Sequence, residues 1–205
     1  ILEGGDGDDS LYGDSGNDIL MGDSGNNALF GSSGDDLLIG GSGKDKLDGA
    51  EGNDTLIGGG GKDVLDGGSG DDMLMGGGSA DTFVFHGGGG NDVILDFQKG
   101  IDVLQVAKNI NGLKVSSAED VALLATSDNG SAVIDFGNGD SITLLGFMSL
   151  PGSGHPSCSE GEKVLAVVKA HIPDDPEAPT GLPADPGFEV VTERRPAEGC
   201  IETPT

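Results

Sequence analysis

The sequence predicts an all-β solenoid in which nine-residue units stack into two parallel sheets. Two observations predict it: 40 of the 205 residues are glycine, and a large apolar residue returns at every ninth position. Glycine-rich acidic chains can also be disordered, but a strict period indicates a repeat architecture. The periodic apolar positions are Leu2, Leu11, Leu20, Leu29, Leu38, Leu47, Leu56, Leu65, Leu74 and Phe83.

Each unit divides into a turn and a short strand. In the unit that begins at Gly4, a second glycine stands at position four (Gly7), an acid at position six (Asp9) and leucine at position eight (Leu11). Glycine tolerates positive φ, so the first six residues favour a turn, and the last three form a strand about 10 Å long whose central residue points inward. Two units therefore make one flattened coil of 18 residues, with a leucine on each inner face.

Composition divides the chain into three parts. Residues 1–150 hold 34 of the glycines, whereas residues 151–205 hold all nine prolines and both cysteines. We expect a repeat array over residues 1–104, a capping subdomain over 105–150 and a proline-rich tail over 151–205. Ile1-Leu2-Glu3 has the pattern of the end of a further unit, so we expect the array to extend upstream.

Charge restricts the partners of the chain. It carries 36 acidic and 10 basic side chains, a formal net charge of −26. Such a chain repels nucleic acid and anionic lipid, and its natural partners are cations. No apolar run approaches the roughly 18 residues of a membrane span. We therefore expect no nucleic acid partner and no membrane span.

Stacking the coils creates an electrostatic problem that a metal would solve. Equivalent turns lie 18 residues apart in sequence but only about 4.8 Å apart in space. Carboxylates at that spacing repel by about 1 kcal/mol in water and about 3.5 kcal/mol at a dielectric constant of about 20. The alternative, a solvated acidic face, leaves this repulsion uncompensated. Carboxylates and backbone carbonyls are hard oxygen ligands, which suit Ca²⁺ better than Zn²⁺ or Cu²⁺.

The unit G-G-x-G-x-D-x-U-x resembles the calcium-binding nonapeptide of the repeats-in-toxin (RTX) family. The resemblance covers residues 1–104, including a degenerate tenth copy at residues 87–95. It implies a right-handed parallel β-roll, a secreted, extracellular protein, and the type I secretion machinery as a partner. It also implies that sixth-position side chains of facing turns hold Ca²⁺, namely Asp9, Asp18, Asn27, Asp36, Asp45, Asp54, Asp63, Asp72, Asp81 and Asp92.

Further ligands complete the expected sites. Asp96 and Asp102, beyond the last unit, either hold a final calcium ion or cap a turn. We expect backbone carbonyls at positions two and four of the units to supply the remaining oxygens. These candidates are Gly5, Gly7, Asp14, Gly16, Gly25, Gly34, Gly41, Gly43, Gly52, Gly59, Gly61, Gly68, Gly70 and Gly77.

Charge counting gives an expected number of ions. Residues 1–105 hold 21 acids and four lysines. About eight Ca²⁺ ions nearly neutralise this charge, so we expect about seven to nine ions between turns paired with their second neighbours. Asn27 weakens the two sites beside it.

Residues 81–150 have the features of a cap. Wide side chains close the open end of the leucine seam. Two strands are expected at 92–97 and 100–104, an N-capped helix after Ser117, and a hairpin from 131–136 and 141–145. Five of the seven phenylalanines lie in this region: Phe83, Phe85, Phe97, Phe136 and Phe147.

The tail leaves two readings open. Apolar stretches at 164–168 and 188–191 favour short strands, bracketed by Cys158 and Cys200. A disulfide between these cysteines would stabilise a folded tail by about 4 kcal/mol in an oxidising compartment. The alternative is a disordered tail with two free thiols.

The sequence contains no catalytic constellation. The Gly-Asp-Ser-Gly strings at 13–16 and 22–25 resemble a serine nucleophile loop, but both are repeat units without a nearby histidine. We therefore expect a non-enzymatic module, although its parent protein is free to be an enzyme or a toxin.

Two function classes remain. The first is a module that folds on calcium outside the cell and aids secretion of its parent. The second is an extracellular adhesin or polysaccharide-binding module, with a surface glycan as partner and exposed strand residues as its binding face. Those exposed residues are Tyr12, Met21, Phe30 and Ile39.

Overall fold

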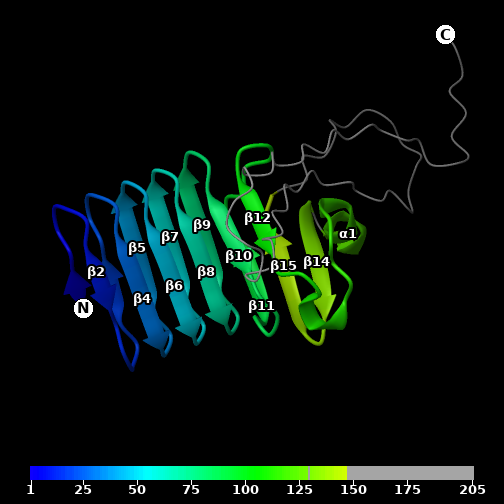
Figure 1. Ribbon diagram of the computed structural model, residues 1–205, viewed down its shortest axis with the longest axis horizontal. Coiled ribbons are helices and arrows are strands. Elements are labelled where there is room, and N and C mark those ends of the chain that lie inside the picture. The colour runs from blue at the N-terminus through cyan, green and yellow to red at the C-terminus, as the bar shows by residue number, and fades with distance from the viewer. Residues whose placement is uncertain (129, 147–205) are drawn as a thin grey trace, which may run out of the picture.

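The computed structural model describes residues 1–128 and 130–146, which form a two-sheet parallel solenoid closed by a small cap (Figure 1). Sheet A has the strand order β1-β3-β5-β7-β9-β11-β15-β14-β13, and sheet B has the order β12-β10-β8-β6-β4-β2. The strands of the roll are β1 (Leu2–Glu3), β2 (Ser10–Tyr12), β3 (Ile19–Met21), β4 (Ala28–Ser33), β5 (Leu37–Ser42), β6 (Lys46–Glu51), β7 (Thr55–Gly60), β8 (Val64–Ser69), β9 (Met73–Gly78), β10 (Thr82–Phe85), β11 (Asn91–Ile94) and β12 (Val103–Val106).

Strand register confirms the 18-residue coil. In sheet A, Leu20 pairs with Leu38 and Leu38 with Leu56, each in parallel. In sheet B, Leu29 pairs with Leu47 in the same way. Every periodic apolar side chain from Leu20 to Phe83 is 0% exposed. The core is therefore one thin seam between the sheets, as the period predicts.

The strands are longer than the three residues expected from the sequence. β2 and β3 have three residues, but β4 to β9 have six. Pairing continues past the leucine into the start of the next unit, where Ser32 pairs with Ala50 and Ser33 with Glu51. The turn that carries the acid is correspondingly shorter than six residues.

The cap extends sheet A. β15 (Asp140–Leu144) pairs in parallel with β11, and β14 (Ser131–Gly137) pairs antiparallel with both β15 and β13 (Ala125–Asp128). The expected hairpin and helix are confirmed: α1 (Ala118–Leu124) begins with a capping box between Ser117 and Asp120. A short 3-10 turn, η1 (Ile110–Gly112), precedes α1.

Aromatic side chains close the seam as expected. Phe83, Phe85, Phe97 and Phe136 are all buried, and the ring centroids of Phe83 and Phe97 lie 5.9 Å apart. The boundary expected after Leu104 falls inside β12, the last strand of sheet B.

Other expectations concern residues beyond those described. Phe147, the strands at 164–168 and 188–191, and the Cys158–Cys200 pair lie outside the described residues. Among residues 1–128 and 130–146, no helix has the length and the apolar composition that a membrane-spanning helix requires.

Candidate metal centre

The turns of the roll line up along two edges. The first edge, at the top of Figure 1, joins sheet A to sheet B; the second edge, at the bottom, joins sheet B to sheet A. The first edge consists of residues 4–9, 22–27, 40–45, 58–63 and 76–81, the first six residues of alternate units, each called a turn below although strands extend into several of them. The second edge consists of turns 13–18, 31–36, 49–54, 67–72 and 87–92.

Sixth-position side chains form a ladder along each edge. The backbone N–H of Asp36 donates to Oδ1 of Asp54 at 2.7 Å, and that of Asp45 donates to Oδ1 of Asp63 at 2.9 Å. The same kind of hydrogen bond joins each turn to the next turn on its edge. On the first edge this series of bonds runs from Asp9 to Asp102. On the second edge it runs from Asp18 to Asp92. The structure thus brings the predicted sixth-position residues together in two files.

The other carboxylate oxygen is left without a partner. In seven of these aspartates, Oδ2 is buried and accepts no hydrogen bond from the described residues. A buried charged oxygen without a donor or counter-ion costs several kcal/mol, so seven such atoms indicate a missing positive charge. The seven atoms belong to Asp9, Asp36, Asp45, Asp54, Asp63, Asp72 and Asp81.

Beside five of the seven unpartnered oxygens, a backbone carbonyl lies close to the same first-position glycine. A Cβ placed on Gly58 would lie 2.6 Å from Oδ2 of Asp63 and 2.7 Å from the carbonyl oxygen of Gly76, one coil on. Gly40 has the same surroundings, at 2.6 Å from Oδ2 of Asp45 and 2.7 Å from the carbonyl oxygen of Gly58. A carboxylate oxygen and a carbonyl oxygen therefore lie beside the same glycine at these five positions, and this donor set fits a hard cation such as Ca²⁺.

Asn27 shows which groups surround the unpartnered position. Its Nδ2 takes the place of the aspartate Oδ2 and makes long contacts with two carbonyl oxygens, Gly25 at 3.4 Å and Gly40 at 3.5 Å. These are the fourth position of its own turn and the first position of the next turn on the same edge. Carbonyl oxygens therefore surround the position of Oδ2, where a positively charged group would be stabilised.

The carbonyl candidates separate into two groups. Position four lies beside the site, as Gly25 illustrates. Several position-two carbonyls instead accept a backbone hydrogen bond: Gly5 from Ser24 at 3.0 Å, and Asp14 from Ser33 at 3.0 Å. Sequence reasoning missed the first-position carbonyls. A signal was present, because glycine opens every unit although several of these glycines, such as Gly58, do not have positive φ.

Asp96 and Asp102 fit the turn-capping alternative. Both oxygens of Asp96 accept backbone N–H groups, from Gly76 at 2.9 Å and Gly77 at 2.8 Å. Asp102 accepts from Asp81 at 3.0 Å and from Gln98 at 2.7 Å. These carboxylates satisfy donors that a further coil would otherwise satisfy.

Burial changes the acidity of the ladder. Desolvation, reinforced by neighbouring carboxylates and opposed by the backbone hydrogen bonds, raises the pKa of Asp54 and Asp63 to about 6. The same causes raise the pKa of Asp72 to about 7 and that of Asp92 to about 8. A metal-free roll at neutral pH therefore holds carboxylates that resist ionisation.

The candidate ligands are carboxylate oxygens and backbone carbonyl oxygens. Among residues 1–128 and 130–146, no group of three or more His, Cys, Asp or Glu side chains is placed to hold an ion. Each site would rely on one carboxylate per turn together with backbone carbonyls. Such oxygen sets suit Ca²⁺ rather than zinc.

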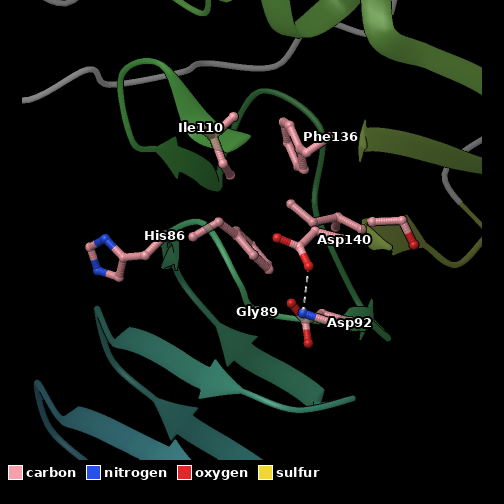
Figure 2. A pocket seen from close by; sticks show the side chains of 10 residues that line it. His86, Gly89, Asp92, Ile110, Phe136 and Asp140 are labelled. Atoms are coloured by element: carbon pink, nitrogen blue, oxygen red, sulfur yellow. Dashed lines mark hydrogen bonds between the residues drawn. The ribbon is translucent and has the colours of Figure 1, made fainter. Parts of the chain in front are cut away.

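Asp140 ends the second edge, and sequence reasoning missed it. Asp140 and Asp92 line a cavity of about 10 Å³ between the roll and the cap, and Figure 2 shows both side chains. Asp140 accepts hydrogen bonds from Gly88 N–H at 2.6 Å, Gly90 N–H at 3.2 Å and Asn111 Nδ2 at 2.6 Å. Burial raises the pKa of Asp140, but these bonds together outweigh it and hold the pKa below its usual range. No repeat position marks this residue, because it comes from the cap hairpin.

Comparisons with known proteins agree with this geometry. The profile of the RTX calcium-binding nonapeptide repeat matches in four copies, at residues 1–29, 21–56, 48–83 and 84–95. No curated protein sequence matches the chain.

Two solved structures are similar over much of the chain. The extracellular lipase LipA from Serratia marcescens has 22% identity and a TM-score of 0.39, covering 70% of this chain but 37% of the lipase. The AlgE6R3 subunit from the Azotobacter vinelandii mannuronan C5-epimerase has 25% identity and a TM-score of 0.30, covering 89% of this chain and 93% of that one. Residues 1–95 thus match the RTX calcium-binding nonapeptide repeat, in agreement with the 18-residue register and the two files of aspartates.

Proposed function

We propose that the described chain is a non-catalytic, calcium-responsive module of a secreted protein. It is unfolded where calcium is scarce and folds where calcium is millimolar. Folding outside the cell stabilises the parent protein and aids its secretion. The observation that carries this proposal is the set of seven buried, unpartnered Oδ2 atoms.

Those atoms couple folding to calcium. Without a cation, closing each coil buries a carboxylate oxygen that water had solvated, which opposes folding. An ion that binds only the folded chain stabilises it by mass action. Because the sites consist of facing turns, they do not exist in the unfolded chain. Folding and binding are therefore one process.

This coupling supports a role in export. An unfolded acidic chain can pass a narrow channel, and the calcium concentration on the far side then drives folding. The resemblance to RTX proteins supports the type I secretion machinery as the exporter and an extracellular location for the product.

The test is a calcium titration of the whole chain, followed by far-ultraviolet circular dichroism at pH 8. We expect little strand signal in excess chelator, and a gain of strand signal as free calcium rises to millimolar. Magnesium at the same concentration serves as the control, because Mg²⁺ keeps its waters and demands a tighter octahedral site. Full strand signal in chelator would refute the proposal.

A binding role on a calcium-held scaffold is the second candidate, favoured by one observation. The rings of Tyr12 and Phe30 stack on the outer face of sheet B, with centroids 4.9 Å apart and an angle of 9° between their planes. Met21 and Ile39 belong to sheet A, so the four predicted residues do not share one face, and of the four only Tyr12 is exposed whereas the others are half-buried. A glycan screen at saturating calcium tests this role; a specific ligand lost in Tyr12→Ala would support it, and no ligand would contradict it.

A further inference from the structure

The two edges of the roll differ in charge. The five first-edge turns hold seven acids and two lysines, Lys44 and Lys62, for a net charge of −5. The five second-edge turns hold nine acids and no lysine, for a net charge of −9. Both edges contain five turns. The candidate sites on the second edge therefore lie in a more negative potential.

A ladder of fifth-position side chains strengthens the contrast. On the second edge, Oδ1 of Asn17 accepts from Asp35 N–H, Oδ1 of Asp35 from Asn53 N–H, and Oδ1 of Asn53 from Asp71 N–H. Oδ1 of Asp71 then accepts from Asn91 N–H at 2.7 Å, so the ladder runs the length of this edge. The side chains alternate between amide and carboxylate, so that two acids are never adjacent in the ladder.

The same ladder stops early on the first edge. Asp8 accepts from Asn26 N–H at 2.7 Å, and Asn26 accepts from Lys44 N–H at 2.9 Å. From there the fifth position is Lys44, Lys62 and Ala80, which offer no acceptor to the next coil. The first edge thus loses side-chain bonds between its turns and gains two positive charges beside its candidate sites.

Asn27 removes a further charge from the first edge. Its Nδ2 already contacts the carbonyl oxygens that a cation would share, at 3.4 and 3.5 Å. The sixth position on the second edge is aspartate in every turn from 13 to 92. Each of the two candidate sites between Asn27 and a neighbouring turn therefore has one sixth-position carboxylate, whereas the other candidate sites have two.

We infer that the two edges take up calcium at different concentrations, with the second edge filling first. The inference rests on the proposed calcium-binding function and adds an order of loading to it. A unit charge about 8 Å from a divalent ion in water changes the dissociation constant by about fivefold. Two lysines and a missing carboxylate together therefore separate the edges by about tenfold or more in free calcium.

A residue-resolved titration tests this order. The whole chain, labelled with ¹⁵N, is titrated with buffered free calcium, and backbone amide signals of the turns are followed by NMR. We expect signals of second-edge turns to reach their calcium-bound positions at about tenfold lower free calcium than those of first-edge turns. Movement of both edges at one free calcium concentration would overturn the inference.

Asp54 and Asp63 offer matched variants on opposite edges. Each is 1% exposed, and each has an unpartnered Oδ2. Asp54→Asn should weaken the tight phase of calcium uptake and leave the weak phase in place. Asp63→Asn should weaken only the later phase. Equal effects of the two variants on both phases would also overturn the inference.

Charge removal tests the cause. Lys44→Gln with Lys62→Gln should shift first-edge uptake toward lower calcium by about tenfold, bringing the two phases together. Lys114→Gln, in the cap and outside both edges, is the control for net charge and should shift neither phase. No change in the double variant contradicts the electrostatic cause. A chain that takes up no calcium at all refutes the proposed function instead, so the two failures are distinguishable.

Discussion

Acidification should replace calcium in holding the roll together. Burial raises the pKa of Asp72 from 3.8 to about 7 and that of Asp54 to about 6. The folded metal-free chain therefore binds more protons than the unfolded chain between about pH 4 and pH 8, and its stability falls as pH rises through that window. Below pH 4 both states are protonated and the penalty is absent.

The size of the effect follows from the shifts. One pKa unit corresponds to about 1.4 kcal/mol, so Asp72 alone destabilises the metal-free roll by about 4 kcal/mol above pH 7, and Asp54 by about 3 kcal/mol. Small domains have a total stability of about 5–15 kcal/mol. A destabilisation of this size is a large fraction of that total, so the calcium-free roll should be much less stable at pH 8 than at pH 5.5.

Circular dichroism of the calcium-free chain measures this directly. We expect strand signal to rise when pH is lowered from 8 to 5.5, where Asp72 and Asp92 are protonated. Asp72→Asn removes the titrating group, so at pH 8 the metal-free variant should be more stable than wild type by up to about 4 kcal/mol. The same variant should need more calcium to reach full strand signal, because it has lost a ligand oxygen.

The opposite outcome would refute a role of the buried carboxylates in opposing folding. If strand content of the calcium-free chain is the same at pH 8 and pH 5.5, and Asp72→Asn leaves its stability unchanged, the buried carboxylates do not oppose folding. Asn27 supplies an internal precedent, since an amide already occupies one rung of the first edge with its Oδ1 hydrogen bond intact.

Three further predictions concern the turns and the cap. Gly58→Ala places a Cβ against a carboxylate and a carbonyl, so it should lower the free energy of unfolding, measured in urea at saturating calcium, by about 1–3 kcal/mol. Gly60→Ala is the control, because nothing lies within 4 Å of the added carbon, and it should leave the free energy of unfolding unchanged. Equal losses in the two variants would contradict the packing argument. Asp140→Ala leaves buried donors unsatisfied, so it should lower the free energy of unfolding by about 2–4 kcal/mol and speed amide hydrogen exchange at Gly90. Unchanged exchange at Gly90 would exclude a role for Asp140 at the end of the roll. Ser117→Ala removes a helix cap and should lower stability, measured by thermal unfolding, by about 1 kcal/mol. Calcium uptake should stay the same; a change in uptake would show that calcium binding depends on α1.

Much of the fold follows from the sequence because one period determines it. Leucine at every ninth residue sets the 18-residue coil, and the pairing of Leu38 with Leu56 confirms it. The six-residue strands were not predictable in this way. They depend on glycine and serine positions that read as turn residues, and only backbone pairing between coils makes them strand.

The candidate site was predictable in its side chains but less so in its carbonyls. Periodicity places the sixth-position aspartates in two files, yet it does not say which oxygen of Asp63 is already used by a backbone N–H. Which carbonyls lie beside the candidate site depends on which backbone atoms of neighbouring coils approach each other, as the carbonyl oxygen of Gly76 approaches Gly58. Asp140 lies in a hairpin without a repeat signature, so its position at the end of the second edge is a result of tertiary structure alone.

The central claim is that the unpartnered Oδ2 atoms are cation ligands. A crystal structure grown in calcium, with anomalous diffraction data collected to locate Ca²⁺, tests it most directly. The account predicts anomalous peaks between successive turns, beside Oδ2 of residues such as Asp54 and Asp63 and the carbonyl oxygen of the next first-position glycine. An intact roll with no peak at these positions would contradict it.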